Sequence, residues 1–324
     1  MTVNSDYRPP IWLRSGMLQT ALASNSMRKK RGEEFESNTT KLVLNAGPGL
    51  RTSCYLNERP DAAGMIILFH GWLGTPQSSY VVSAAKALHD AGFSVARLTL
   101  PEHGEAALMN AAVIDLSRHD FIREAVWDIA SRSPETPLGL MGFSLGGNFA
   151  LRLARDLKAH PIPQLRHVLA VSPVIEPSDT CDMIDAFGIF RRYFLKKFAD
   201  LSREKQAEFP EMQGVQEVLA KKSIRSLTEF SVRQWTEYPS IEAYFNAYRI
   251  HPDDFAGCPT SLTLLTALDD PIVRSIHAQR LSESAALEPI FTRHGGHNGF
   301  FSRFPSQAFS DDVAVKKFRQ SVLG

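Results

Sequence analysis

Ser144 stands alone among glycines in the stretch GFSLGG, where an apolar run ends and a helical pattern begins. Gly142, Ser144 and Gly146 form the pattern G-x-S-x-G, and Gly147 follows directly. On a tight strand-to-helix turn a serine adopts a strained backbone conformation, and side chains two residues away on either side would collide. Glycines relieve that clash, and the helix dipole favours negative charge near its N-terminus. The pattern predicts a nucleophilic serine; the alternative is a glycine-softened turn with an incidental hydroxyl.

A nucleophilic serine needs a base and an acid that orients the base, in the chain order serine, acid, histidine. The stretch LLTALDDPIV offers Asp269 and Asp270 just after an apolar run. We favour Asp270, which directly precedes Pro271 in the loop, and assign Asp269 a capping role. The stretch FTRHGGHNGF offers His294 and His297. We favour His297, inside the glycine-rich loop; His294 lies against the strand end, where its role could simply be a hydrogen bond to the backbone.

The developing oxyanion requires backbone N–H donors, of which one is expected from Leu145, the residue after the nucleophile. The second is expected from an early loop, and the stretch LFHGWLG fits that position. Here Gly71 and Gly74 let the backbone approach the substrate, Trp72 supplies its N–H, and His70 organises the loop. A zinc interpretation of His70 finds no H-E-x-x-H or comparable ligand pair. We therefore expect neither metal nor cofactor.

Apolar strands and amphipathic helices alternate along most of the chain, which implies a mostly parallel sheet with helices on both faces. This is the α/β fold class. A Gly-Pro-Gly turn at 47–49 precedes the alternation and joins two further expected strands. The main predicted strands cover residues 64–69, 93–100, 137–142, 166–172, 260–267 and 288–293.

The alternation stops between about residues 176 and 251, where aromatic and charged residues are frequent and no convincing strand occurs. We interpret this segment as a helical cap inserted between two strands of the sheet. The expected organisation has four parts: an N-terminal extension that packs on the core (1–40), the first part of the core (41–175), the cap (176–251) and the second part of the core (252–324).

Phenylalanines recur in the cap at three- and four-residue spacing, which predicts a helix with one aromatic stripe and cations on its other faces. The favoured interpretation is a cap helix that lays this stripe over the serine. Two alternatives are contact of the cationic faces with an anionic lipid surface, and plain core packing. The residues expected to line the substrate pocket are Phe143, beside the serine, and Phe187, Phe190 and Phe194 of the stripe.

Together these motifs resemble the α/β-hydrolase superfamily. The stretches YRPPIWLRSGMLQT, FHGWLGTPQSSY, GFSLGGN, DDPIV and HGGHNGF look more closely like its fourth AB-hydrolase subfamily, which includes bacterial short-chain esterases and eukaryotic lipid-directed relatives. The resemblance implies Ser144, Asp270 and His297 as a catalytic triad. The chain departs from many relatives at LTLPEHGEAALMN, where we expect His103 and Asn110 to shape the pocket wall.

The charge balance and the cysteine content indicate which binding partners and which cellular compartment to expect. Of 324 residues, 36 are lysine or arginine and 35 are aspartate or glutamate, so no global field favours nucleic acid. The basic run RKKR at 28–31 is interpreted as a solvated helix face. Three scattered cysteines form no disulfide framework, which indicates a reduced, cytoplasmic compartment. We see no signal peptide and no apolar run long enough to span a bilayer.

The sequence thus predicts a serine carboxylic-ester hydrolase that works through an acyl-enzyme on short- to medium-chain acyl esters or lipids. The expected partner is a small-molecule ester, with peripheral lipid contact as an additional option. One alternative is an acyltransferase that uses the same triad and replaces water by an alcohol or thiol. Another is a binding protein that keeps the pocket without turnover.

Overall fold

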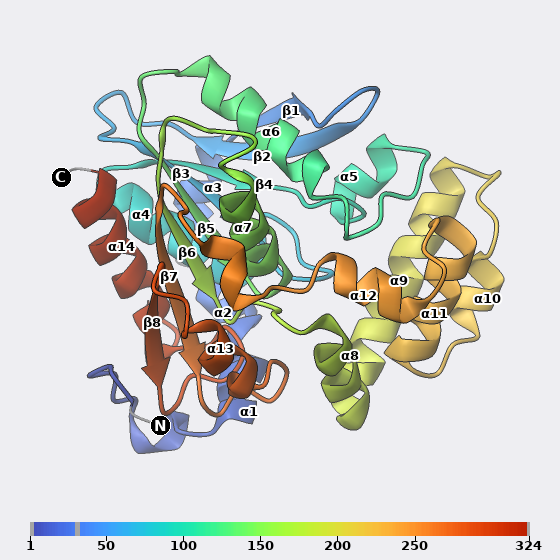
Figure 1. Ribbon diagram of the computed structural model, residues 1–324. Coiled ribbons are helices and arrows are strands. Elements are labelled where there is room, and N and C mark those ends of the chain that lie inside the picture. The colour runs from blue at the N-terminus through green and yellow to red at the C-terminus, as the bar shows by residue number, and fades with distance from the viewer. Residues whose placement is uncertain (1–2, 30–32, 323–324) are drawn as a thin grey trace.

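An eight-stranded sheet forms the centre of the protein in the computed structural model, which describes residues 3–29 and 33–322 (Figure 1). Its strands are β1 (Thr40–Asn45), β2 (Arg51–Asn57), β3 (Met65–Phe69), β4 (Ser94–Leu98), β5 (Leu138–Phe143), β6 (Leu165–Val171), β7 (Ser261–Ala267) and β8 (Leu287–Thr292). They lie in the order β1-β2-β4-β3-β5-β6-β7-β8, and only the pairings of β2 with β1 and β4 are antiparallel. The predicted α/β class and mostly parallel sheet are confirmed.

Helices cover both faces of the sheet, which explains why its central strands are apolar on both sides. In β3, Ile67 and Phe69 pack in the cluster on one face, whereas Ile66 and Leu68 pack in the cluster on the other. The first face is covered by α6 (His119–Arg132), α7 (Leu145–Asp156) and α13 (Ser275–Leu281), and the second by α4 (Ser79–Asp90) and α14 (Phe309–Val322) (Figure 1).

The carboxyl ends of the parallel strands meet at one edge of the sheet, and the loops that follow them carry the predicted site residues. His70 follows β3, Ser144 follows β5, Asp270 follows β7 and His297 follows β8. The parallel topology therefore brings together residues that are far apart along the chain.

Between β6 and β7, where every residue is described, the chain forms five α-helices followed by one short 3-10 helix, and no strand. The α-helices are α8 (Pro177–Ala186), α9 (Gly188–Glu208), α10 (Val215–Leu219), α11 (Ile224–Trp235) and α12 (Ile241–Ala247). Figure 1 shows α9 to α12 grouped at one side of the sheet, beyond α7. They bury side chains of their own, among them Val232, Tyr244 and Phe245. The predicted helical character of this segment is confirmed, and the division into four parts stays a prediction.

The N-terminal segment precedes the sheet and consists of short elements. These are the 3-10 helix η1 (Ile11–Leu13) and the helices α1 (Gly16–Ala23), α2 (Ser26–Lys29) and α3 (Glu33–Ser37). The remaining elements are α5 (Gly104–Met109), the 3-10 helix η3 (Pro252–Phe255) and a two-stranded sheet of β9 (Phe301–Arg303) and β10 (Gln307–Ala308). Among the described residues, no helix is long and apolar enough to cross a membrane.

The interpretation of the basic run as a solvated face is wrong for Arg28. Its side chain is completely buried, lies 3.5 Å from the Asp311 carboxylate and donates a hydrogen bond to the Asn298 carbonyl oxygen. The reason is tertiary, because α2 packs against α4 and places this side chain beside the start of α14. Burial lowers the pKa of Arg28 and raises the pKa of Asp311. Lys30 and Arg31 lie outside the described residues.

We expect Asp311→Asn to lower the free energy of unfolding by about 3 kcal/mol, because it leaves the buried Arg28 guanidinium without its counter-charge. Urea unfolding followed by circular dichroism measures this loss. Asp312→Asn is the matched control, since Asp312 occupies the same first turn of α14 and is exposed. The control should cost less than about 1 kcal/mol. Equal losses for both variants would show that the ion pair contributes nothing beyond the helix dipole.

Candidate active site

Ser144 lies on a strained turn between β5 and α7. Its backbone angles are φ 54° and ψ −117°, which a residue with a side chain rarely adopts. The surrounding backbone is crowded: a Cβ on Gly142 would overlap the Gly146 carbonyl oxygen, and a Cβ on Gly146 would lie 2.5 Å from the His70 carbonyl oxygen. Both glycines are therefore required by close backbone contact, as the G-x-S-x-G spacing predicts.

A buried carboxylate orients the histidine. The Nδ1–H of His297 donates to Asp270 Oδ2 at 2.8 Å, and the other oxygen of Asp270 accepts from the N–H groups of Ile272 and Val273. The Asp270 side chain has no exposed surface. Because Nδ1 carries the proton, Nε2 is left as the free acceptor of the imidazole.

Ser144 and His297 line the same cavity. Nε2 of His297 has no hydrogen-bond partner among the described residues, and the hydroxyl of Ser144 is not bonded to it. Hydrogen bonds between catalytic groups are often long in the absence of substrate and shorten when it binds. The imidazole thus presents an unoccupied acceptor to the cavity that contains the hydroxyl.

Asp269 and His294, the alternative acid and base, contact each other and the glycine-rich loop. Asp269 accepts a hydrogen bond from the Gly296 N–H at 2.9 Å, and its other oxygen is 3.6 Å from Nδ1 of His294. Burial raises the pKa of Asp269. His297 lines the cavity that Ser144 lines, and His294 does not. Asp270 is the carboxylate bonded to the histidine that lines the cavity, whereas Asp269 lies beside His294.

The loop after β3 approaches the serine from the other side. A Cβ on Gly71 would lie 3.2 Å from Cβ of Ser144, and the Gly74 N–H closes a turn on the Gly71 carbonyl oxygen. His70 donates from Nδ1 to that same oxygen and accepts the Leu100 N–H at Nε2. Burial lowers the pKa of His70 well below its usual value, so the ring is neutral. These contacts support the predicted loop-organising role of His70.

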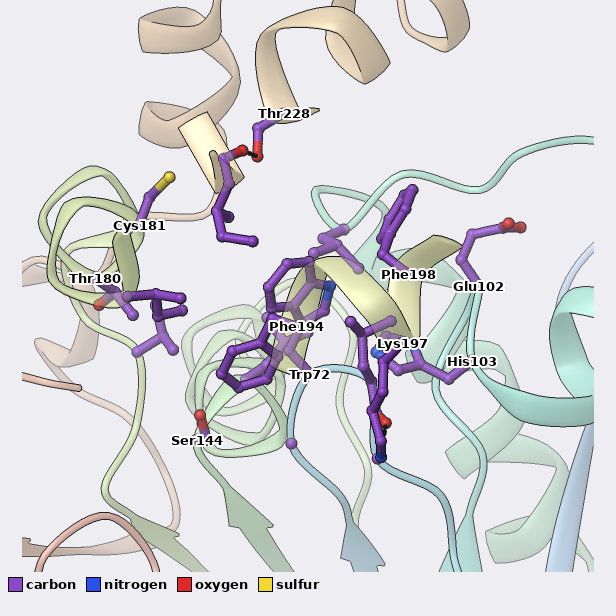
Figure 2. Close-up of a pocket in the computed structure, with 18 of the residues that line it drawn as sticks. Trp72, Glu102, His103, Ser144, Thr180, Cys181, Phe194, Lys197, Phe198 and Thr228 are labelled. Carbon is purple, nitrogen blue, oxygen red and sulfur yellow. Dashed lines mark hydrogen bonds between the residues drawn. The ribbon is translucent and has the colours of Figure 1, made fainter. Parts of the chain in front are cut away.

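Two backbone N–H groups are available beside the serine. Leu145 is the first residue of α7 and Trp72 is in the turn, and neither N–H has an acceptor within the described part of the chain. Leu73, the next residue of the turn, has a strained φ of 53°, and its carbonyl oxygen accepts a hydrogen bond from Lys197 of α9. The ring of Phe194, also in α9, stacks on Trp72 at 5.1 Å (Figure 2). The cap therefore holds the turn from above.

The cavity has a volume of about 400 Å³ and is walled by the sheet loops, the cap and α1. Phe190 and Phe194 line it, as predicted for two residues of the aromatic stripe. Other aromatic residues that line it are Trp72, Tyr80, Tyr193, Phe198, Trp235, Tyr244, Phe245 and Tyr248.

Two of the residues expected in the pocket do not line it. Phe143 is completely buried on the face of the sheet under α4, where its ring packs against Tyr80. Phe187 precedes the first residue of α9 and contacts Phe190 edge-on outside the cavity. The helix begins one residue too late to continue the stripe through Phe187.

The loop between β4 and α6 supplies part of the cavity wall, as expected for His103, and it also takes part in an ion pair that the sequence did not reveal. Lys205 of α9 is 2% exposed and donates to both carboxylate oxygens of Glu102 at 2.8 Å. His103 lines the cavity beside this pair, and burial lowers its pKa to about 4. Asn110 does not line the cavity, because its amide bonds the backbone of Arg51. No spacing rule connects residues 102 and 205, so this contact is visible only in three dimensions.

A parallel sheet covered on both faces, with a serine on a strained turn after a central strand, defines the class of α/β hydrolases. The sequence model of the alpha/beta hydrolase family matches residues 66–312 of this chain. The chain therefore belongs to that family. The relation thus covers most of the chain and begins within β3.

Individual relatives are distant. The chain is 23% identical to the monoacylglycerol lipase of Saccharomyces cerevisiae over 315 residues, which cover 88% of this chain and 67% of the lipase. The structure of an esterase from Pyrococcus furiosus superposes with a TM-score of 0.58 at 14% identity, covering 89% of this chain and 93% of the esterase. A serine hydrolase from a Cycloclasticus bacterium gives 0.58 at 14% identity, covering 87% and 99%. At this identity the two structures are informative about the fold.

We expect Gly142→Ala to lower the free energy of unfolding by about 3 kcal/mol, because the added methyl group would lie 2.6 Å from the Gly147 nitrogen and would force β5 away from α7. Thermal unfolding measures the loss. Gly188→Ala is the control, since a Cβ there meets nothing closer than 3.8 Å, and it should change stability by less than about 0.5 kcal/mol. Native-like stability of Gly142→Ala would contradict the crowding described for this turn.

Proposed function

We propose that the protein is a serine carboxylic-ester hydrolase that works through an acyl-enzyme, with Ser144 as nucleophile, His297 as base and Asp270 as orienting acid. The observation that carries the proposal is the Asp270–His297 hydrogen bond, which leaves Nε2 free toward the cavity that Ser144 lines. Family membership supports hydrolysis as the reaction type.

In the proposed reaction the Ser144 hydroxyl attacks the ester carbonyl carbon while His297 Nε2 accepts its proton. The Asp270 carboxylate stabilises the imidazolium that forms. The N–H groups of Leu145 and Trp72 bind the oxyanion, and each donor contributes roughly 3 kcal/mol to lowering the barrier. The imidazolium then protonates the leaving alkoxide, and water releases the acid by the reverse sequence of proton transfers.

The wall of the cavity favours an acyl chain as the group bound beside the serine. Aromatic and aliphatic side chains dominate it, and the buried Glu102 carboxylate is already paired with Lys205. Burial of each methylene stabilises a bound chain by about 0.8 kcal/mol. We therefore propose short- to medium-chain acyl esters or lipids as substrates, which agrees with the names of the yeast lipase and the Pyrococcus esterase. The free thiols of the three cysteines support the proposed cytoplasmic location.

Ser144→Ala, His297→Ala and Asp270→Asn test the catalytic assignment. The first two should lower kcat for p-nitrophenyl butanoate on the order of 10⁴-fold or more, since members of such a unit fail together. Asp270→Asn should lower it less, because the base remains present in the wrong tautomer. Steady-state kinetics on purified variants measures these losses. His294 lies outside the cavity, so His294→Ala should keep most of the activity. Loss of activity in His294→Ala together with an active His297→Ala would overturn the choice of base.

Thr228→Phe tests the binding mode of the acyl chain. Figure 2 shows Thr228 on the cap, at the opposite end of the cavity from Ser144. A phenyl ring there should exclude the distal methylenes of a long acyl chain from the cavity. Each methylene that is no longer buried should weaken substrate binding about fourfold. We expect kcat/KM for the dodecanoyl ester to fall at least about tenfold while that for the butanoyl ester changes little. Thr228→Val, which keeps the shape, should keep the native chain-length preference, and an unchanged preference in Thr228→Phe would place the acyl chain elsewhere.

A further inference from the structure

The N-terminal segment holds the loop that carries His297. Four side chains between residues 7 and 28 each form a hydrogen bond to the backbone of residues 297–301. The Thr20 hydroxyl accepts the His297 N–H at 2.8 Å, and Gln19 accepts the Phe301 N–H at 2.7 Å. Arg28 donates to the Asn298 carbonyl oxygen at 3.0 Å, and the Tyr7 hydroxyl donates to the Phe301 carbonyl oxygen at 2.8 Å. The loop is bonded along its length by one segment.

Close backbone contact accompanies these bonds. A Cβ on Gly299 would lie 2.6 Å from the Gln19 carbonyl oxygen, and a Cβ on Gly296 would overlap the Gly16 carbonyl oxygen. Gly16 in turn packs so tightly on the Asp269 carbonyl that a side chain there would overlap it. Glycines on both partners therefore let α1 and the loop meet main chain to main chain.

Thr20 occupies the centre of this contact. Its hydroxyl donates its proton to the Gly16 carbonyl oxygen at 2.7 Å and uses one of its two acceptor positions for the His297 N–H. Asp269 accepts the neighbouring N–H, that of Gly296. The amides of two consecutive residues, Gly296 and His297, are thus each fixed by a side chain from another segment.

The same helix also forms part of the cavity wall, through Thr20, Ala21, Ala23 and Ser24. The family match begins at residue 66, so this segment lies outside it. From these contacts we propose that Thr20 is a positioning residue for His297, and that the N-terminal segment completes the active site of the family core. The proposal rests on the function proposed above, because it assigns Thr20 to the base of that reaction.

Thr20→Val removes the hydroxyl and keeps the shape of the cavity wall. We expect the rate constant for fluorophosphonate labelling of Ser144, and kcat for the butanoyl ester, to fall about tenfold or more, since small misplacement of a catalytic group is costly. KM should stay within about twofold of native. The final extent of labelling should stay native, whereas a variant that merely folds less well would lose extent and keep its rate constant. Thr20→Ser, which retains the hydroxyl, should restore the native rate constant.

Tyr7→Phe provides a second test at the far end of the loop, where it removes the hydroxyl that donates to the Phe301 carbonyl oxygen and accepts from the Gln19 amide. A smaller fall in the same rate constant is expected. Native rate constants in both Thr20→Val and Tyr7→Phe, or equal losses in Thr20→Val and Thr20→Ser, would overturn the positioning role. Failure of the proposed function itself looks different, because the native protein would then neither label at Ser144 nor hydrolyse esters.

Discussion

The proposed site depends on one interaction, the hydrogen bond between the buried Asp270 carboxylate and His297. An ionised carboxylate taken out of water is destabilising by several kcal/mol unless hydrogen bonds satisfy it. Two of its donors, the N–H groups of Ile272 and Val273, come from its own turn, but the third is Nδ1–H of His297, from another loop. The carboxylate is fully satisfied only when both loops are in place. Satisfying the buried acid and orienting the base are therefore the same structural requirement.

The cap acts on the opposite side of the serine. Phe194 stacks on Trp72 and Lys197 bonds the Leu73 carbonyl, so α9 contacts the turn that carries the proposed oxyanion donor. The buried Lys205–Glu102 pair ties the same helix to the loop after β4. Since α9 also supplies aromatic residues to the cavity, one helix contacts both the cavity wall and the turn that carries Trp72. Under the proposed function, substrate size and oxyanion binding would therefore be coupled through α9.

Much of the architecture follows from local pattern. Strand and helix periodicity located the sheet, and close packing at Gly142 and Gly146 accounts for the serine motif. Alternation along β5 would also have corrected one error, because Phe143 shares a face with Met141 in the cluster under α4. Composition could not show that Arg28 is buried, since its partner Asp311 is far away in sequence. Helix spacing alone could not fix the start of α9, which excludes Phe187 from the cavity.

Contacts between the N-terminal segment and the histidine loop show why the remaining part of the site escaped prediction. Thr20 and His297 are 277 residues apart, and a threonine within a short helix carries no motif. What the chain does carry is glycine: Gly16 in α1, and Gly296 and Gly299 in the loop, each where a Cβ would meet the main chain of the other segment or of Asp269. Glycine loses more backbone freedom on folding than any other residue, so Gly16, the first residue of α1, has a local entropic cost at its own position. The compensation is long-range, because only a bare backbone lets α1 approach closely enough for the Thr20 hydroxyl to reach the His297 amide.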